Sequence, residues 1–170
     1  MEFIEKGSKN DILYWSKRLY QKGMSPAKSG NISIKTKNGI LISATGTCLN
    51  DMNENDIVLT DYSGNLIEGN KKPSSETIMH CEIYSQRDDI TSIIHCHCPL
   101  ISAFSVAGVP ITKNILPDFA YYYGEVPIVP YYLPSSIELA QNTAKFFEKY
   151  DVVLLKNHGV VAGADSLQNA

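Results

Sequence analysis

The chain has 170 residues, of which 44% are hydrophobic and 19% charged, and its formal net charge is -3. This length suits one globular domain, and the weak negative charge offers no basic surface for a nucleic acid or an anionic membrane. The sequence contains no apolar run of about 20 residues, the length needed to span a bilayer, and no signal-peptide core near its start. We therefore expect a cytoplasmic protein that acts on a small molecule.

The first half of the chain predicts a helix followed by short strands. Ser8 and Asp11 form a capping pair at the start of a helix over residues 8–22. Strand-like stretches follow at residues 31–35, 39–43 and 57–60. A hairpin turn at residues 63–65 and a polar connector at 71–75 lead to a second helix at about 75–86.

Strand and helix alternate in the second half of the chain. A strand at residues 92–97 precedes a helix that Pro99 opens and Gly108 closes. The remaining predicted elements are a strand at 126–129 within an irregular aromatic segment (111–134), a helix at 135–150 with Ser135 and Glu138 as its capping box, a strand at 152–155, an extended run at 160–162 and the start of a helix at 165–170. This pattern indicates one mixed α/β domain, residues 1–170, built on a largely antiparallel sheet.

Two histidines share one face of the strand at residues 92–97. Because side chains alternate along a strand, His95 and His97 point to one side, and Cys96 and Cys98 point to the other. A single buried histidine is more often a core residue than a ligand, but two imidazoles at this spacing suit a borderline metal such as zinc. The His-x-His pair therefore indicates a metal site.

Further ligands have to come from other parts of the chain. His158 follows the buried run at 152–155 and precedes Gly159, so a tight turn can direct its ring, although a role in capping a carbonyl would explain it equally well in isolation. His80 lies one helical turn after Glu76, and we expect it to be a buried structural residue rather than a ligand. Glu76 is either a simple helix-capping acid or a metal ligand and proton carrier.

Three small polar clusters have the composition of loops that hold phosphate groups. They combine hydroxyl groups or a glycine with exposed backbone N–H groups, and they lie at Ser29-Gly30-Asn31, Thr45-Gly46-Thr47 and Ser74-Ser75. Each cluster alone would be an ordinary turn. The sequence has no Walker loop and no Gly-x-Gly-x-x-Gly fingerprint, so nucleotide-dependent chemistry is unsupported.

The histidines and the polar clusters form one ordered set of motifs. The set consists of Ser29-Gly30-Asn31-Ile32-Ser33, Ser43-Ala44-Thr45-Gly46, Pro73-Ser74-Ser75-Glu76, His95-Cys96-His97 and Asn157-His158-Gly159. In order and spacing it resembles the class II aldolase/adducin family, most closely the L-fuculose-1-phosphate aldolase branch. The resemblance covers nearly the whole chain.

This resemblance implies a site, a fold and an assembly. Zinc, or another divalent metal, would be bound by Glu76, His95, His97 and His158, with Glu76 also catalytic. Phosphate would be bound at Gly30, Asn31, Thr45, Gly46, Ser74 and Ser75. The implied fold is a central sheet with helices on both sides, in a homotetramer with active sites between neighbouring subunits. Because the family continues beyond the strand after His158, a C-terminal part of the domain is expected to be missing.

The implied reaction is cleavage of a ketose 1-phosphate of the fuculose, rhamnulose or 5-deoxypentulose type to dihydroxyacetone phosphate and an aldehyde. The metal would polarise the oxygens at C2 and C3, and Glu76 would carry the proton. Asn114 stands where the branch has a loop tyrosine, with Tyr121, Tyr122 and Tyr123 nearby, so no catalytic tyrosine is assigned.

Other branches of the family give alternative interpretations. Ribulose-phosphate 4-epimerases resemble the chain but carry Asp at the Glu76 position and at the Ala120 position. Methylthioribulose-1-phosphate dehydratases use a loop Glu as acid/base, which Asp118 or Glu125 would approximate. Adducin-like interaction proteins have lost the metal histidines, and the intact set in this chain argues against a purely structural role.

Overall fold

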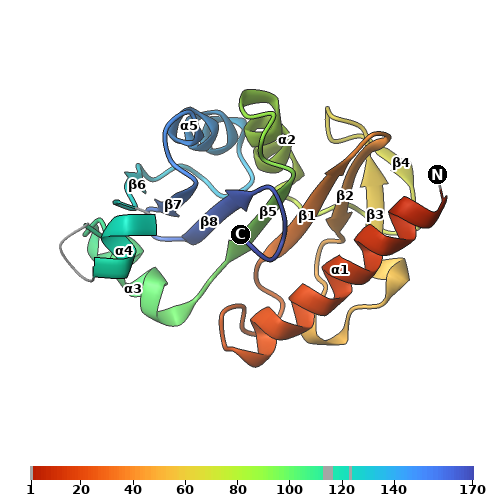
Figure 1. The fold of residues 1–170 in the computed structure, drawn as a ribbon, viewed down its shortest axis with the longest axis horizontal. Coiled ribbons are helices and arrows are strands. Elements are labelled where there is room, and N and C mark those ends of the chain that lie inside the picture. Colours follow the sequence, from red (N-terminus) through yellow and green to blue (C-terminus); the bar gives the residue numbers. More distant parts are fainter. Residues whose placement is uncertain (1, 113–116, 123) are drawn as a thin grey trace.

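An eight-stranded sheet forms the centre of the molecule (Figure 1). The structure is a computed structural model and describes residues 2–112, 117–122 and 124–170. The strand order of the sheet is β4-β3-β2-β1-β5-β8-β7-β6, and every pair is antiparallel except β6–β7. The strands are β1 (Asn31–Thr36), β2 (Gly39–Ser43), β3 (Ile57–Thr60), β4 (Leu66–Glu68), β5 (Ser92–Cys96), β6 (Ile128–Val129), β7 (Val152–Leu155) and β8 (Gly159–Ala164). The prediction of a mixed α/β fold with a largely antiparallel sheet is confirmed.

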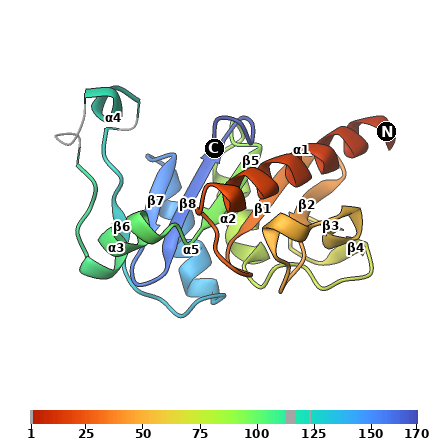
Figure 2. The same ribbon diagram turned by 90° about the horizontal axis from the view of Figure 1, so that it is seen from below.

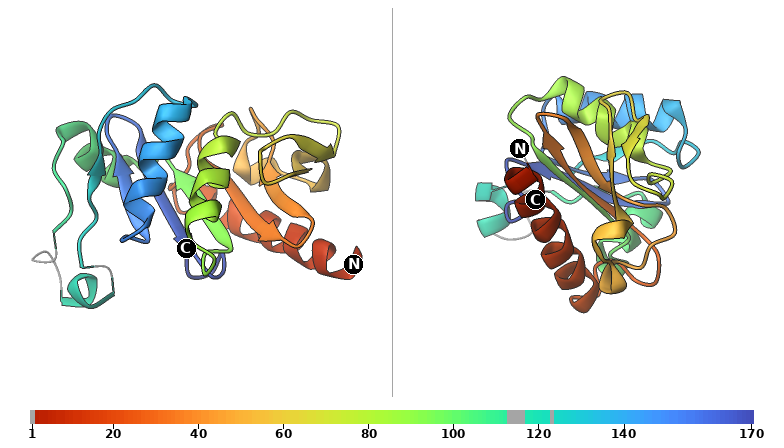
Figure 3. Two further views of the ribbon diagram at one scale, coloured as in Figure 1. Left: turned by 90° about the horizontal axis from the view of Figure 1, so that it is seen from above. Right: turned by 90° about the vertical axis from the view of Figure 1, so that its right-hand side faces the viewer.

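Helices cover both faces of this sheet, as the edge-on view shows (Figure 3). They are α1 (Glu2–Gln21), α2 (Thr77–Gln86), α3 (Pro99–Ala107), α4 (Pro117–Tyr122) and α5 (Ile137–Phe147), with single 3-10 turns at Leu49–Asp51 and Glu54–Asp56. Helix α1 packs on β1 from one side, whereas α2 and α5 pack against each other on the opposite side. Helix α3 lies against β7 and β8 (Figure 2).

Alternation along the strands divides the apolar side chains into two cores. Ile93 of β5 is buried in the core beneath α2 and α5. Its neighbours Ile94 and Cys96 are buried in the core beneath α1. His95 has the same parity as Ile93, so β5 directs it to the α2 side of the sheet.

The structure shifts the start of two predicted helices and replaces a third predicted helix by turns. Helix α1 begins at Glu2, earlier than the predicted residue 8. Helix α5 begins at Ile137 and is capped by Ser136, whose hydroxyl accepts a hydrogen bond from Leu139 N, so the prediction of Ser135 as the cap is wrong. The helix predicted at 165–170 is also wrong, because this segment forms hydrogen-bonded turns. No helix in the described ranges is both long enough and apolar enough to cross a membrane.

Candidate active site

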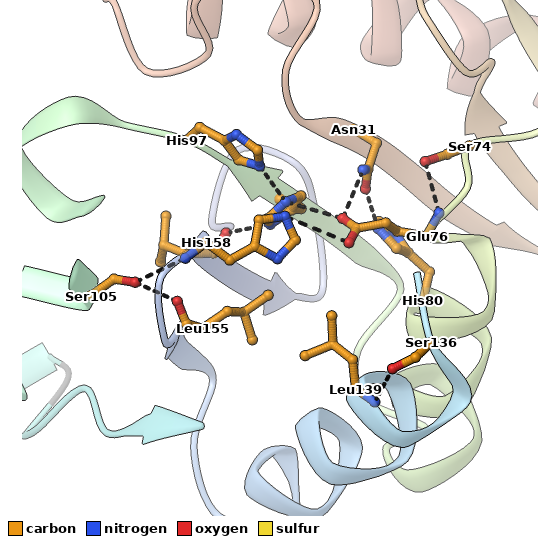
Figure 4. A network of polar contacts seen from close by, with 12 residues as sticks. Asn31, Ser74, Glu76, His80, His97, Ser105, Ser136, Leu139, Leu155 and His158 are labelled. Carbon is orange, nitrogen blue, oxygen red and sulfur yellow. Dashed lines mark hydrogen bonds and ion pairs between the residues drawn. The ribbon is translucent and has the colours of Figure 1, made fainter. Parts of the chain in front are cut away.

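Four predicted site residues meet at the ends of the central strands, where Figure 4 labels Glu76, His97 and His158. His95 is the fourth residue of β5, and His97 follows the strand directly. His158 lies in the turn between β7 and β8, and Glu76 is the residue before α2. Because β8 pairs with β5, the turn before β8 lies beside the end of β5 and brings the third histidine to the first two.

The ring nitrogens and the carboxylate of this cluster point at one another. His95 Nε2 lies 3.0 Å from His97 Nε2. Glu76 Oε2 lies 3.1 Å from His95 Nε2, and Glu76 Oε1 lies 3.7 Å from His158 Nε2. The three histidines each offer a ligand atom within 4.8 Å of the others. This arrangement can hold a metal ion.

The hydrogen bond of His95 fixes which of its nitrogens is free. Its Nδ1 lies 3.0 Å from the carbonyl oxygen of Val160, which only accepts, so Nδ1 carries the proton and Nε2 has a lone pair. Burial lowers the pKa of His95 well below its usual value, and the nearby rings of His158 and His97 lower it further. Burial, followed by the influence of His158, also lowers the pKa of His97. Both rings are therefore neutral at pH 7, as metal ligands must be.

Two buried polar atoms of the cluster lack a hydrogen-bond partner among the described residues. They are Glu76 Oε1 and His158 Nδ1. Glu76 itself is only 5% exposed, and a buried carboxylate without a counter-charge is costly. A divalent cation fits this donor set of neutral imidazoles and one carboxylate, because it would supply the missing positive charge.

A chain of hydrogen bonds orients the Glu76 carboxylate (Figure 4). Asn31 Nδ2 donates to Glu76 Oε2 at 3.4 Å, and Asn31 Oδ1 lies 2.5 Å from His80 Nε2. Because an amide oxygen only accepts, His80 is protonated on Nε2, and its Nδ1 accepts from Ser33 Oγ at 2.7 Å. Tyr84 Oη lies 2.8 Å from Ser33 Oγ and completes the chain. His80 is thus a buried structural residue behind Glu76.

The turn that carries His158 is tied to helix α3. Ser105 Oγ donates to the carbonyl of Leu155 and accepts from His158 N at 3.3 Å. The tight turn uses a positive φ at Asn157, whereas Gly159 is required by space: a Cβ there would lie 2.4 Å from the carbonyl oxygen of Cys96. Sequence reasoning missed Ser105, because nothing near it in the chain indicates contact with a turn about 50 residues away.

A pocket of about 180 Å³ opens beside the cluster. It is lined by all ten residues predicted for the metal and phosphate sites, together with Lys28, Ser29, Ala44, Thr47, Pro134 and Ser135. Gly30 is required there, because it has a φ of 77° and a Cβ would lie 2.6 Å from the His95 carbonyl oxygen. The hydroxyl groups of Thr45 and Ser75 make no hydrogen bond within the described part of the chain and can donate to a ligand.

Sequence reasoning missed Lys28, Pro134 and Ser135, which also line this pocket. Lys28 is the one lysine or arginine among the described residues that line it. Ser135, predicted only as a helix cap, lines the pocket instead. A lysine within a turn next to a Gly-Asn motif would have been the available signal for Lys28.

The loop acids considered as alternative proton carriers are not shown at the site. Glu125 is exposed, accepts a hydrogen bond from Tyr150 Oη at 2.7 Å and does not line the pocket. The side chain of Asp118 lies outside the described residues, as do Asn114, Tyr123 and the side chain of Tyr122. Tyr121 is 84% exposed.

Comparison with known proteins identifies the family. The profile of the Class II Aldolase and Adducin N-terminal domain matches residues 10–170. An L-fuculose phosphate aldolase of Methanocaldococcus jannaschii is 36% identical over 162 residues, which are 95% of this chain and 87% of the relative. A 3-oxo-tetronate 4-phosphate decarboxylase of Pectobacterium atrosepticum is 30% identical over 98% of this chain and 78% of the relative. A solved L-fuculose 1-phosphate aldolase aligns with a TM-score of 0.90 and 33% identity, covering 96% of this chain and 78% of that one.

The chain therefore belongs to the class II aldolase and adducin family, as its motifs predicted. Within that family it is a class II aldolase, a lyase close to the L-fuculose-phosphate aldolases. The family is generally metal-dependent, which agrees with the histidine cluster.

Proposed function

We propose that Glu76, His95, His97 and His158 bind one divalent cation, with zinc the preferred ion. The proposal is supported by the convergence of three imidazoles on a buried carboxylate, one oxygen of which has no hydrogen-bond partner among the described residues. Nitrogen ligands together with one carboxylate suit zinc better than the oxygen-only preference of calcium or magnesium. Metal analysis of the purified chain tests the identity of the ion.

The substrate proposed for this site is a ketose 1-phosphate of the fuculose, rhamnulose or 5-deoxypentulose type. Its phosphate would be held by Gly30, Asn31, Thr45, Gly46, Ser74 and Ser75, with the Lys28 ammonium adding the charge that a dianion needs. Asn31 would contribute in a second way as well, because its side chain holds Glu76. The products would be dihydroxyacetone phosphate and an aldehyde.

Cleavage requires the residues of this chain to transfer one proton and to stabilise one developing negative charge. The C4 hydroxyl gives up a proton as the C3–C4 bond breaks and the C4 carbonyl forms, and one proton is returned to C3 of the resulting enediolate, so no net proton is consumed. A divalent cation held by Glu76, His95, His97 and His158 would supply Lewis-acid stabilisation of the negative charge that develops. Glu76 would hold the proton that C3 receives, since Asn31 fixes one of its oxygens and the other has no hydrogen bond within the described residues.

Decarboxylation of a 3-oxo acid phosphate is the second candidate function. Its support is the similarity to 3-oxo-tetronate 4-phosphate decarboxylases, which covers 98% of this chain. Loss of carbon dioxide from a 3-oxo acid leaves an enolate, so the same histidine cluster and carboxylate would stabilise it. The two candidates differ in the leaving group rather than in the charge that the site must stabilise.

One experiment separates these candidates. The full chain, loaded with zinc, is given L-fuculose 1-phosphate or 3-oxo-tetronate 4-phosphate, and release of dihydroxyacetone phosphate and of carbon dioxide is measured. We expect dihydroxyacetone phosphate from the first substrate and little turnover of the second. Carbon dioxide release alone would establish the decarboxylase, and no turnover of either would exclude both functions for this polypeptide.

We also propose that the chain forms a homotetramer with its sites close to subunit interfaces. The supporting feature is an apolar surface on and just after α3, which begins two residues after His97. Its members are Leu100, Phe104, Val106 and Val109, exposed by 80%, 38%, 61% and 50%. Apolar side chains gathered on one helix commonly mark a protein interface.

A further inference from the structure

The turn before α5 places a serine in a conformation that favours glycine. Ser136 N donates to the carbonyl of Leu133 at 3.1 Å, which closes a turn with Pro134 and Ser135 at its two central positions. Ser135 has a φ of 66°. Proline followed by a residue with positive φ is the arrangement of a type II turn, whose third position is normally glycine or asparagine. A serine with a Cβ is therefore strained there.

Non-glycine residues with positive φ gather around the candidate active site. The non-glycine residues with positive φ in the described backbone are Ala27, Ser135 and Asn157. Ala27 precedes Lys28 and Asn157 precedes His158, and both of these following residues line the pocket. Ser135 lines the pocket itself. Backbone strain that is concentrated at a site persists when it serves the geometry of that site.

The surroundings of Ser135 hold its backbone but leave its side chain free. The neighbouring Ser136 caps α5 through a 3.1 Å hydrogen bond from Leu139 N, and Tyr132 packs against the core beneath α2 and α5. The Ser135 hydroxyl makes no hydrogen bond within the described residues. The hydroxyl group of this pocket-lining residue is thus not used for structure.

Ser135 lines the same pocket as the phosphate-binding loops and the histidine cluster but comes from a different part of the chain. Those loops belong to the ends of β1 and β2 and to the start of α2. Ser135 precedes α5, which packs on α2 and β7, whereas the other loops precede β1 and α2 or follow β2. A substrate whose phosphate is in the loops and whose reacting carbons are at the histidines would have its remaining hydroxyl groups in this shared pocket, where Ser135 is a lining residue without a structural hydrogen bond.

We propose that the Ser135 hydroxyl binds the hydroxyl-bearing end of the substrate remote from the phosphate, and that it is a specificity-determining residue. This inference rests on the proposed function, because it takes the substrate to be a sugar phosphate. The strained φ is retained because glycine, which would relax the turn, has no hydroxyl group to present.

Two non-cleavable ligands of different length test the inference. Glycerol phosphate carries the phosphate and a short chain, whereas L-fucitol 1-phosphate, a ketose phosphate reduced at C2, adds the remaining hydroxyl groups but has no carbonyl for cleavage. Dissociation constants are measured by calorimetry on the zinc-loaded wild type, Ser135→Ala and Ser135→Gly. Both variants should bind L-fucitol 1-phosphate about 3- to 10-fold more weakly, the effect of one neutral hydrogen bond, and glycerol phosphate unchanged.

Thermal unfolding of the same proteins separates binding from structure. Ser135→Gly should have a Tm about 2–4 °C above that of Ser135→Ala, because glycine relieves the positive φ. If Ser135→Gly is more stable than Ser135→Ala but binds L-fucitol 1-phosphate more weakly than the wild type, the Ser135 hydroxyl group has a role in binding.

Unchanged affinity in Ser135→Ala, equal losses for both ligands, or a wild type that binds both ligands equally would overturn the inference. Serine-dependent binding without dihydroxyacetone phosphate release from the ketose would instead disprove the proposed function alone.

Discussion

Glu76 combines three properties that rarely occur together in one carboxylate. It is buried, it lies between two imidazoles, and one of its oxygens has no hydrogen-bond partner among the described residues. A capping acid at the start of a helix would normally face water, so the helix dipole alone does not explain this position. A role in binding a cation and carrying a proton explains all three properties.

Glu76→Gln should lower the turnover of sugar-phosphate cleavage by about 10²-fold or more, because the amide keeps the size of the side chain and removes the base. Zinc should remain bound through the three histidines. Initial rates of dihydroxyacetone phosphate release and metal analysis check both outcomes.

Glu125→Gln is the matched control, since Glu125 is exposed and hydrogen-bonded to Tyr150. It should leave turnover close to that of the wild type. If Glu125→Gln abolished turnover and Glu76→Gln did not, the proton carrier would be the loop acid, as in a dehydratase.

His80 should make the free energy of unfolding depend on pH. Burial lowers the pKa of His80 from 6.5 to about 3. The nearby His95 also lowers this pKa, whereas Glu76 acts in the opposite direction. Below pH 6.5 the unfolded chain therefore binds a proton at His80 that the folded chain does not, and stability is lost as the pH falls towards 3. The free energy of unfolding contributed by this residue falls by up to about 1.4 kcal/mol per pH unit.

Urea unfolding of the wild type and His80→Gln between pH 7.5 and 4.5 measures this dependence. The advantage in stability of the wild type should shrink as the pH falls, because glutamine does not titrate. The other histidines with a lowered pKa, His95 and His97, are present in both proteins, so their contributions cancel in the comparison. Parallel curves would show that His80 carries no proton-linked stability.

The sequence was enough to predict the candidate metal ligands of the site, but not the hydrogen bonds that orient them. Strand parity was enough to place His95 and His97 together, because the period of a strand is fixed. The hydrogen bonds of Asn31 to Glu76 and His80 join residues about 45 or more positions apart, and no local pattern indicates them. For the same reason Asn31 was predicted for the phosphate alone.

At the scale of elements, α3 and the β7–β8 turn form one unit. Ser105 joins them through the carbonyl of Leu155 and the backbone N–H of His158, and Lys156 Nζ adds a hydrogen bond of 3.0 Å to the carbonyl of Val106. The position of the third histidine therefore depends on a helix that contributes no metal ligand.

Ser105→Ala should lower the free energy of unfolding by about 0.5–1.5 kcal/mol, because it removes two hydrogen bonds of a buried hydroxyl, whereas His158 N and the Leu155 carbonyl keep their own 3.0 Å hydrogen bond. It should also weaken zinc binding by about 10-fold, since the His158 turn loses its side-chain link to α3. Chemical denaturation and competition with a metal chelator measure the two effects.

Ser102 provides the control on the same helix. Its hydroxyl is buried and has no hydrogen-bond partner within the described residues. Ser102→Ala should leave zinc affinity unchanged and stability equal or slightly higher. A similar loss of zinc affinity in both variants would show that α3 as a whole, rather than Ser105, holds the turn.

Local signals located most elements but not all of their ends. The capping box at Ser135 and Glu138 was one residue out of register, because the preceding turn needs Ser135 in a left-handed conformation and leaves Ser136 to cap α5. The segment 165–170 has helical composition but forms turns. Sequence propensity is a weak guide where a segment is short and packing decides the outcome.

For the whole molecule, the order of strands could not be read from the sequence. Strand β5 lies between β1 and β8, so the two halves of the site, around Asn31 and His158, meet only through this crossover (Figure 1). The alternation of polar and apolar residues predicts a sheet with two covered faces, but many strand orders satisfy it. The family resemblance implied a central sheet with helices on both sides, and the structure supplies the strand order.

Oligomer formation should depend on the apolar surface around α3. Replacing both Leu100 and Val106, which are 80% and 61% exposed, by Asp should convert the proposed tetramer to smaller species, because buried carboxylates would oppose contact between subunits. Ile67→Asp is the control: Ile67 is 55% exposed but belongs to β4 at the far edge of the sheet, so the tetramer should persist. Light scattering coupled to gel filtration gives the mass of each protein. A monomeric wild type, or a double variant that stays tetrameric, would refute an interface at α3.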